Sequence, residues 1–218
     1  EVCALPVIAT LTFEADGRTL CGTDAKTAAV VLESLGASAI GANCSTGPAQ
    51  MEGIISDMVS VTTIPIIAKP NAGLPFLDEN GTTCYNMEAE EFTEEMQVLV
   101  NAGATILGGC CGTTPDHMRL LKQLIEGHTP QLRHHDPAMY VTSAQSCVTL
   151  PVAGHRIAVI GERINPTGKK RLQQALRDGD LDYVVSQGIS QQEQGADILD
   201  VNVGLPEIDE VKMIQAAC

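Results

Sequence analysis

The feature that most constrains the fold of this chain is a regular alternation of apolar runs with helical stretches. Four short apolar runs occupy residues 6–13, 37–43, 63–69 and 104–107. The first is continuous rather than interrupted by alternating polar residues, which is typical of a strand covered on both faces. Segments with helical periodicity follow the runs, at residues 25–35, 48–59, 88–101 and 115–126. Residues 1–127 are therefore predicted to form four successive strand–helix units.

Such units build either a doubly wound sheet or a (β/α)8 barrel of the TIM type, and in both folds ligands bind at the carboxyl ends of the strands. A full barrel needs about 250 residues, so residues 1–127 would make roughly the C-terminal half of one. Residues 128–154 lack helical periodicity and are rich in Pro, Ser and Thr. We expect them to be a linker between domains.

Strand and helix patterns resume after the linker, so residues 155–218 are predicted to open a second α/β domain. The strands are expected at residues 156–160 and 195–204. The helix between them should break near Gly179 and Asp180, and another helix should occupy residues 208–217. The chain begins at Glu1 without Met and stops within this last helical pattern. We therefore expect a fragment of a longer protein.

Three cysteines follow the ends of two predicted strands. Cys44 comes after the strand at 37–43, and the pair Cys110 and Cys111 comes after the strand at 104–107, between glycines that permit a sharp turn. Three thiolates on one Zn²⁺ leave a fourth tetrahedral position open for a substrate. Two other interpretations stay open: the cysteines could be small apolar fillers, or the adjacent pair could form a strained vicinal disulfide.

Charge and cysteine content narrow the functional class. The formal net charge of −14 argues against a nucleic-acid partner, because binding to phosphates needs a basic surface. No run of about 18 apolar residues occurs, so we expect no membrane span, and no secretory leader is visible. The eight cysteines are not spaced as a disulfide framework. We therefore expect a reducing compartment, the cytoplasm, where clustered thiols are more often ligands or nucleophiles than bridges.

Polar residues at other strand ends are further candidates. Lys69 and Asn71 could contact substrate, although Lys69 could equally form an ion pair inside a barrel. In the second domain a polar cluster mixes carboxylates with carboxamides, which together offer the donors and acceptors that an amide-rich heterocycle needs; the alternative is that these residues cap helices and form turns. The cluster consists of Glu162, Asn165, Asp200 and Asn202. His117 is expected to cap a helix or lie on the surface, and His134 and His135 to be solvated in the linker.

Several of these motifs resemble those of known families. Residues 41–45 (GANCS), 108–113 (GGCCGT) and 69–75 (KPNAGLP) resemble the zinc-binding signature and an intervening strand of the homocysteine S-methyltransferase family. Residues 161–168 (GERINPTG) and 200–204 (DVNVG) resemble the first strand ends of pterin-binding barrels. The two domains in this order are similar to the cobalamin-dependent methionine synthase family, which implies that residues 155–218 start a second (β/α)8 barrel.

The resemblance implies a function and a set of partners. Cys44, Cys110 and Cys111 would hold Zn²⁺, and homocysteine would bind at the open position as a thiolate. The methyl group would come from 5-methyltetrahydrofolate through cobalamin, which a domain absent from this chain would bind. Glu162, Asn165 and Asn202 would contact the pterin, with Asp200 a further candidate. Without the remaining barrel strands and the cobalamin-binding domain, we expect these residues to be inactive alone.

Two alternatives remain at this stage. The chain could belong to a homocysteine methyltransferase that uses another methyl donor, such as betaine or S-methylmethionine, although the pterin-like stretch at 161–168 argues against it. It could also be a non-catalytic zinc-binding module or a partner of a corrinoid protein.

Overall fold

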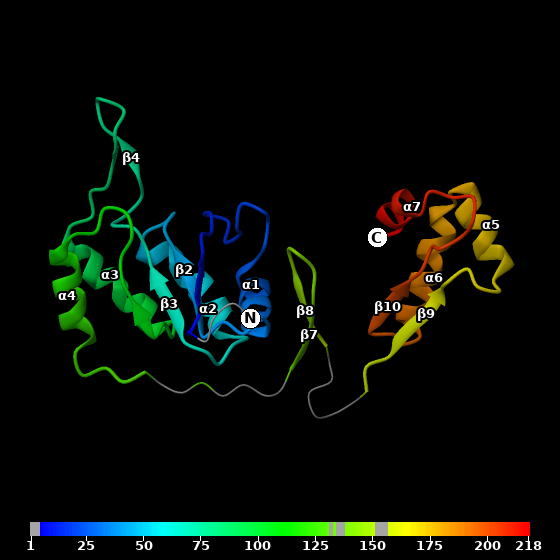
Figure 1. Ribbon diagram of the computed structural model, residues 1–218, viewed down its shortest axis with the longest axis horizontal. Helices are drawn as coiled ribbons and strands as arrows, with labels where there is room; N and C mark the ends of the chain where they lie inside the picture. The colour runs from blue at the N-terminus through cyan, green and yellow to red at the C-terminus, as the bar shows by residue number, and fades with distance from the viewer. Residues whose placement is uncertain (1–4, 131–132, 134–137, 151–156) are drawn as a thin grey trace. The chain divides into compact units, whose positions relative to one another are not determined.

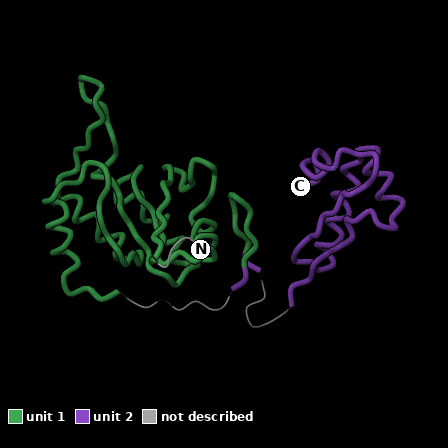
Figure 2. The backbone as a smooth tube through the Cα atoms, in the orientation of Figure 1, with its two compact units in different colours: residues 1–136, 140–148 green, residues 137–139, 149–218 purple. Residues whose placement is uncertain are grey.

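The computed structural model describes residues 5–130, 133, 138–150 and 157–218. The chain divides into two compact units (Figures 1 and 2). One unit holds residues 1–136 and 140–148, and the other holds residues 137–139 and 149–218. His134 and His135, which were expected to be solvated in the linker, lie outside the described residues. Within the described residues, no helix combines the length and the apolar character that crossing a membrane requires.

A four-stranded parallel sheet forms the centre of the first unit. Its strands are β1 (Ile8–Leu11), β2 (Ala39–Asn43), β3 (Ile66–Lys69) and β6 (Ile106–Leu107), and they lie side by side in the order β1-β2-β3-β6 (Figure 1). The four strands correspond to the four predicted apolar runs, so the α/β class and the parallel sheet are confirmed. The order follows the chain, as the arc of a barrel requires; the closed barrel itself stays a prediction.

Each strand leads into a helix whose start and end follow from local sequence. The helices are α1 (Ala25–Ser34), α2 (Pro48–Val59), α3 (Ala89–Asn101) and α4 (Pro115–Ile125). The Asp24 carboxylate caps α1 by accepting a hydrogen bond from the Thr27 N–H at 2.8 Å. Proline occupies the first position of α2 and of α4, where its missing N–H costs nothing.

The helices pack against the sheet through one apolar core. Consecutive helices contact one another, and α1 and α2 contact β2. On the strands the core takes alternate residues, Ile40 and Ala42 on β2 and Ile66 and Ala68 on β3, because successive side chains point to opposite faces. Burial of this core fixes which strand residues point toward the helices. The fully buried helix residues include Ile55, Met58, Phe92, Met96 and Leu99.

Two short hairpins were not predicted: one lies between β3 and α3, and the other lies within the predicted linker. Strands β4 (Phe76–Leu77) and β5 (Thr83–Cys84) form one hairpin, which projects from the first unit (Figure 1). Its turn is held by the Asp78 carboxylate, which accepts hydrogen bonds from the Asn80 and Thr82 N–H groups. Strands β7 (Met139–Thr142) and β8 (Cys147–Leu150) form the other. Two- to four-residue strands with exposed side chains leave no periodic signal in the sequence.

The second unit contains a two-stranded parallel sheet and three helices. Strands β9 (Ile160–Ile164) and β10 (Ile198–Val201) pair in parallel. The helices are α5 (Lys170–Asp178), α6 (Leu181–Glu193) and α7 (Glu210–Ala217). The predicted break is confirmed: Gly179 ends α5 at φ +69°, and the Asp180 carboxylate caps α6.

The position of the first strand in this unit was predicted wrongly. The sequence placed it at residues 156–160, whereas β9 runs from Ile160 to Ile164. The physical reason is the burial of Ile164, which is 4% exposed and packs with Leu172, Leu176 and Val184. Strand β9 therefore pairs with β10 at Ile160, Gly161 and Ile164, with an irregularity of register between the last two, and Glu162 lies within the strand.

Candidate metal centre

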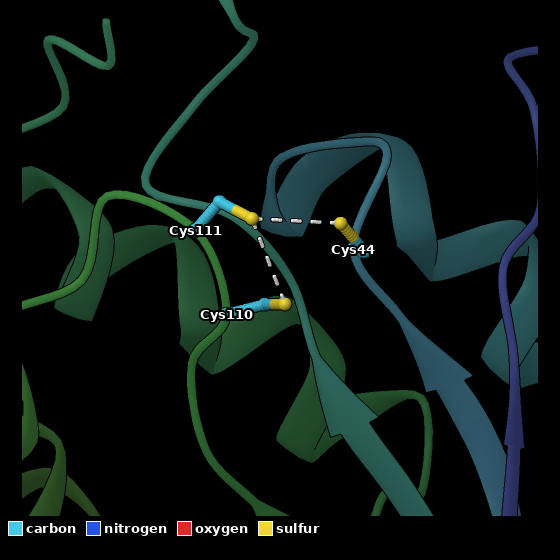
Figure 3. A group of neighbouring side chains, drawn as sticks. All are labelled: Cys44, Cys110 and Cys111. Atoms are coloured by element: carbon cyan, nitrogen blue, oxygen red, sulfur yellow. Dashed lines mark hydrogen bonds between the residues drawn. The ribbon is translucent and has the colours of Figure 1, made fainter. Parts of the chain in front are cut away.

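Three cysteines from two loops meet at the carboxyl edge of the parallel sheet. Cys44 directly follows β2, and Cys110 and Cys111 lie in the loop between β6 and α4. Figure 3 shows the three side chains pointing toward one another. The Sγ atoms of Cys44 and Cys111 are 3.7 Å apart, and those of Cys110 and Cys111 are 3.9 Å apart. All three sulfur atoms lie within 4.8 Å of one another, so the juxtaposition expected from the strand ends is present.

The spacing of the sulfur atoms fits a tetrahedral metal ion. Metal–sulfur bonds of about 2.3 Å in a tetrahedral Zn²⁺ site imply sulfur–sulfur edges of roughly 3.8 Å. Both measured separations lie within 0.1 Å of that value. A disulfide would need sulfur atoms about 2.05 Å apart, and all three residues are free thiols. The donor set, three soft thiolates with one corner of the tetrahedron left over, is the kind that Zn²⁺ prefers.

The loop that carries Cys44 has an unusual backbone. Cys44 and Ser45 adopt φ angles of +64° and +62°, in the left-handed region that costs a non-glycine residue roughly 1 kcal/mol or more. Two backbone hydrogen bonds hold this conformation: the Cys44 N–H donates to the Lys69 carbonyl, and the Thr46 N–H donates to the Cys44 carbonyl. The loop therefore turns the Cys44 thiol toward the neighbouring β6–α4 loop.

The adjacent cysteines are fixed by the segment that follows β3. The Cys110 N–H donates to the Pro70 carbonyl at 2.8 Å, and the Ala72 N–H donates to the Cys111 carbonyl at 2.9 Å. The Cys111 N–H donates to the side-chain oxygen of Asn71 at 3.1 Å. Three consecutive residues of one loop thus fix both cysteines of the other.

A glycine allows the cysteine loop to turn sharply. Gly112 has a φ of +80°, and a Cβ atom at this position would lie 2.5 Å from the Cβ of Tyr85. Both the backbone angle and the close approach of Tyr85 therefore require glycine here. The Thr113 hydroxyl completes the turn by donating to the Cys110 carbonyl at 2.8 Å.

The three thiols are not electrostatically equivalent. Burial, followed by hydrogen bonds with Cys44 and Cys111, raises the pKa of the Cys110 thiol. Hydrogen bonds from Cys44 and from the Tyr85 hydroxyl lower the pKa of Cys111. The same interaction with Cys111 raises the pKa of Tyr85, so the phenol is neutral and can donate at neutral pH. Between Cys110 and Cys111, the site therefore favours the thiolate form at Cys111.

The structure places Lys69 and Asn71 beside the cysteines. Lys69 ends β3, and its side chain lies over Gly108, whose Cβ position would be 3.4 Å from the Lys69 Cγ. Asn71 is buried, with 1% of its surface exposed, and its side-chain oxygen is used by the Cys111 N–H. Their predicted contact with substrate stays a prediction.

His117 lies in the first turn of α4 as a buried capping residue. Its Nδ1 accepts a hydrogen bond from the Thr114 N–H, the reciprocal half of a capping box, and its Nε2 lies 3.0 Å from the Met87 carbonyl. The predicted capping role is confirmed. The alternative of a surface position is wrong, because Phe92 packs edge-on against the ring and only 5% of the residue is exposed.

Sequence reasoning did not identify Tyr85. The residue lies between β5 and α3, in a segment for which neither a strand nor a helix was predicted. The only feature of the sequence that distinguishes Tyr85 is the scarcity of large aromatic residues, since the chain has three tyrosines and no tryptophan. Its contact with Gly112 depends on how residues 74–86 return toward the sheet, which no local pattern specifies.

The polar residues proposed for the second unit lie at or near the ends of β9 and β10. Asn165 and Asn202 directly follow the two strands, and the Asn202 N–H donates to the Ile164 carbonyl at 2.8 Å. Each asparagine also forms a local turn, since its side-chain oxygen accepts from the Thr167 or the Gly204 N–H. Glu162 forms an ion pair of 3.3 Å with Lys169, and Asp200 is exposed on β10. Turn formation, one of the alternatives, is thus observed for both asparagines.

The first unit matches a family model. The model described as homocysteine S-methyltransferase matches residues 1–125, a span that includes all three clustered cysteines.

Similarity to curated proteins extends through both units. The chain is 34% identical over 206 residues to the methionine synthase of Mycobacterium leprae (strain TN), covering 91% of this chain and 17% of that protein. It is 33% identical over 215 residues to the methionine synthase of Mycobacterium tuberculosis (strain ATCC 25618 / H37Rv), covering 97% of this chain and 18% of that protein. The chain thus spans less than a fifth of the length of these relatives. Among solved structures, the oxidized form of the homocysteine methyltransferase MmuM from Escherichia coli aligns over 51% of this chain and 34% of that chain, with a TM-score of 0.39 and 21% identity.

Proposed function

This chain belongs to the homocysteine S-methyltransferase family, and from that premise we propose that it carries the metal centre at which the sulfur of homocysteine receives a methyl group. Cys44, Cys110 and Cys111 are the proposed ligands of Zn²⁺. The observation that carries the proposal is the sulfur–sulfur spacing of 3.7 and 3.9 Å, which suits a tetrahedral ion with one open position.

The proposed chemistry solves a problem of substrate reactivity. A free thiol has a pKa of about 8.5 and is mostly protonated, and hence weakly nucleophilic, at neutral pH. Bound Zn²⁺ would act as a Lewis acid that keeps the homocysteine sulfur deprotonated. The substrate sulfur then forms a bond to the methyl carbon while the bond from that carbon to its donor breaks, with the electron pair left on the donor. The cysteines serve as ligands and are not themselves methylated.

For the methyl source we propose 5-methyltetrahydrofolate, acting through cobalamin bound outside these 218 residues. Two observations support the second unit as the start of a pterin-binding barrel. The similarity to methionine synthases continues well beyond residue 125, over 206 to 215 residues. In addition, Asn165 and Asn202 follow adjacent parallel strands and so lie at one sheet edge. With Glu162 and Asp200 they are the proposed pterin contacts, and Lys69 and Asn71 remain proposed contacts of homocysteine.

Metal analysis of the purified chain tests the proposed centre. We expect about one zinc ion per chain, and X-ray absorption should detect a fourth sulfur ligand when homocysteine is added. Cys110→Ser should abolish stoichiometric binding. Cys147→Ser is a matched control, since Cys147 is a half-buried free thiol on the β7–β8 hairpin. Zinc retained equally by both variants would contradict the proposal.

Binding titrations with 5-methyltetrahydrofolate test the proposed methyl donor. 5-Methyltetrahydrofolate should bind the chain, or a longer form that completes the barrel, and Asn165→Ala and Asn202→Ala should weaken it. Zinc and homocysteine binding without any folate binding in the longer form would favour a homocysteine methyltransferase with another donor. Zinc binding without a change of ligands on adding homocysteine would favour a non-catalytic zinc module.

A further inference from the structure

The turn of the β7–β8 hairpin lies against the loop between β1 and α1. The carbonyl of Gln145, in this turn, accepts hydrogen bonds from the Asp24 N–H and from the Arg18 guanidinium, each at 3.2 Å. Figure 1 shows the hairpin beside α1, which begins directly after the loop. The hairpin comes from the segment predicted to be a linker, and these bonds attach it to the first unit.

Two side chains add to the contact. The side-chain amide of Gln145 donates a hydrogen bond to the Cys21 carbonyl at 3.1 Å, and the Thr23 hydroxyl donates to the Ala144 carbonyl at 2.7 Å. Gly22 has a φ of +84°, and a Cβ atom there would lie 3.0 Å from the Gln145 Nε2. The amide of Gln145 therefore lies directly over a position of the loop that has no side chain.

The loop has a defined shape of its own that the hairpin can contact. The Thr19 N–H donates to the Thr23 carbonyl at 3.0 Å, and the Gly22 N–H donates to the Thr19 carbonyl at 2.7 Å. The Arg18 guanidinium, besides its bond to the hairpin, donates to the Gly22 carbonyl at 2.7 Å. Arg18 thus joins the two sides of the loop to each other and to the turn of the hairpin.

The hairpin has little apolar packing with which to hold itself in place. Of the residues in β7 and β8, only Leu150 is buried. The apolar residues Met139, Val141 and Val148 are each about half exposed or more, at 58%, 49% and 60%. The contacts of the turn are therefore the main attachment of this hairpin.

We propose that the turn of the β7–β8 hairpin is a clamp that orders the β1–α1 loop, with Gln145 as the residue that closes it. Loops that follow parallel strands lie on the ligand-binding side of a sheet. Strand β1 neighbours β2, and Cys44 directly follows β2. The clamp therefore orders a loop on the same side of the sheet as the candidate metal centre, and it does so whether or not a metal is bound.

The clamp has a consequence for the chain that follows it. Residues 149–218 continue directly from the hairpin and, with residues 137–139, form the second unit. Displacement of the hairpin breaks the bonds to Asp24 and Cys21, and so releases the β1–α1 loop. The order of a loop on the ligand-binding side is thereby linked to the segment that leads into the second unit.

Hydrogen exchange of the full 218-residue chain, followed separately in residues 18–24 and 139–150, tests the clamp. Gly22→Ala and Gly17→Ala form a matched pair, because both glycines lie in the loop with positive φ, +84° and +76°, but nothing lies within 4 Å of a Cβ at Gly17. Both variants should exchange faster in the loop, because alanine is strained there. Only Gly22→Ala should also speed exchange in the hairpin, by about two- to fivefold, because its methyl group displaces the Gln145 amide.

The reverse experiment changes the hairpin and observes the loop. Gln145→Ala removes the bond to Cys21, and we expect exchange in residues 18–24 to be about two- to fivefold faster. Gln97→Ala is the control, because the Gln97 amide bonds only to Asn101 within α3. It should leave exchange in residues 18–24 unchanged.

Two results would overturn the clamp. One is equal exchange of the hairpin in Gly22→Ala and Gly17→Ala, and the other is unchanged exchange of the loop in Gln145→Ala. Either would show that the loop is held by its own hydrogen bonds and that the hairpin only lies beside it. Circular dichroism establishes that each variant is folded; if Gly22→Ala is not, Gln145→Ala decides alone, since Gln145 is exposed and its replacement leaves the core intact.

Discussion

The buried side-chain oxygen of Asn71 accepts a hydrogen bond from the backbone N–H of Cys111 at 3.1 Å. Together with the bonds from the Cys110 N–H to the Pro70 carbonyl and from the Ala72 N–H to the Cys111 carbonyl, it links the loop after β3 to the loop after β6. It fixes the orientation of the Cys111 peptide and hence the direction of the Cys111 thiol toward Cys44. The cysteine cluster is therefore a product of loop–loop bonding as well as of strand order.

Replacing Asn71 tests how far this bond determines the cluster. Asn71→Ala leaves the Cys111 N–H without this partner, and the net contribution of such a part-buried hydrogen bond is about 0.5–1.5 kcal/mol. We expect a loss of unfolding free energy of that size in urea, together with weaker binding of Co²⁺ in place of Zn²⁺. Asn101→Ala is the control, because Asn101 is an exposed residue at the end of α3. Equal stability and equal Co²⁺ affinity in the two variants would show that the bond does not hold the loop.

Alanine substitutions at two glycines with the same φ angle distinguish the cost of backbone strain from the cost of a steric clash with a neighbouring side chain. Gly112 and Gly127 both have φ of +80°, but only Gly112 faces Tyr85, whereas nothing lies within 4 Å of a Cβ at Gly127. Gly127→Ala should lower the unfolding free energy by roughly 1 kcal/mol. Gly112→Ala should cost about 1–3 kcal/mol more, because the new methyl group overlaps the Tyr85 ring. Urea unfolding of both variants gives the comparison; similar losses would show that Tyr85 moves aside without cost.

The extent to which the sequence predicts this structure differs between strands and loops. The cysteines could be placed together because parallel strands end at one sheet edge, and Cys44, Cys110 and Cys111 each follow such an end. Helix starts could be predicted because Asp24, Pro48 and Pro115 act within one turn of their own positions. The order of the strands and the local helix caps thus account for most of the fold that could be predicted.

Contacts made between loops were not predictable in the same way. The bond from Cys111 to Asn71 joins residues 40 positions apart, and the contact of Tyr85 with Gly112 depends on the path of the β4–β5 hairpin. The burial of His117 has the same origin, since Phe92 and Met87 cover it from α3 and the loop before it. The prediction ended the first strand of the second unit at residue 160, and the packing of Ile164 against the helices extends β9 to that residue.

The left-handed conformation of Ser45 offers a test of strain at the candidate centre. Ser45 has a φ of +62°, which glycine adopts without steric cost. Ser45→Gly should therefore stabilise the metal-free chain by up to about 1 kcal/mol, the strain relieved being partly offset by the entropy of the unfolded chain. Ser56→Gly is the matched control, because Ser56 lies within α2 and glycine in a helix costs about 0.5 kcal/mol relative to serine. Urea unfolding should show changes of opposite sign in the unfolding free energies of the two variants. If both substitutions destabilise the chain, the Ser45 side chain stabilises the fold by more than its backbone strain costs.

Metal binding should depend steeply on pH, and the dependence reports which thiols are ligands. Each cysteine must lose its proton to bind the metal. Burial raises the pKa of the Cys110 thiol, so this thiol is protonated throughout the neutral range and protons compete with the metal more strongly as the pH falls. The logarithm of the Co²⁺ affinity should then rise by at most about three per pH unit between roughly pH 6 and pH 7.5, and by less where Cys111, whose pKa is lowered, has already lost its proton. In Cys110→Ser the slope should fall by about one, while Cys147→Ser should keep the full slope. An unchanged slope in Cys110→Ser would remove Cys110 from the ligand set.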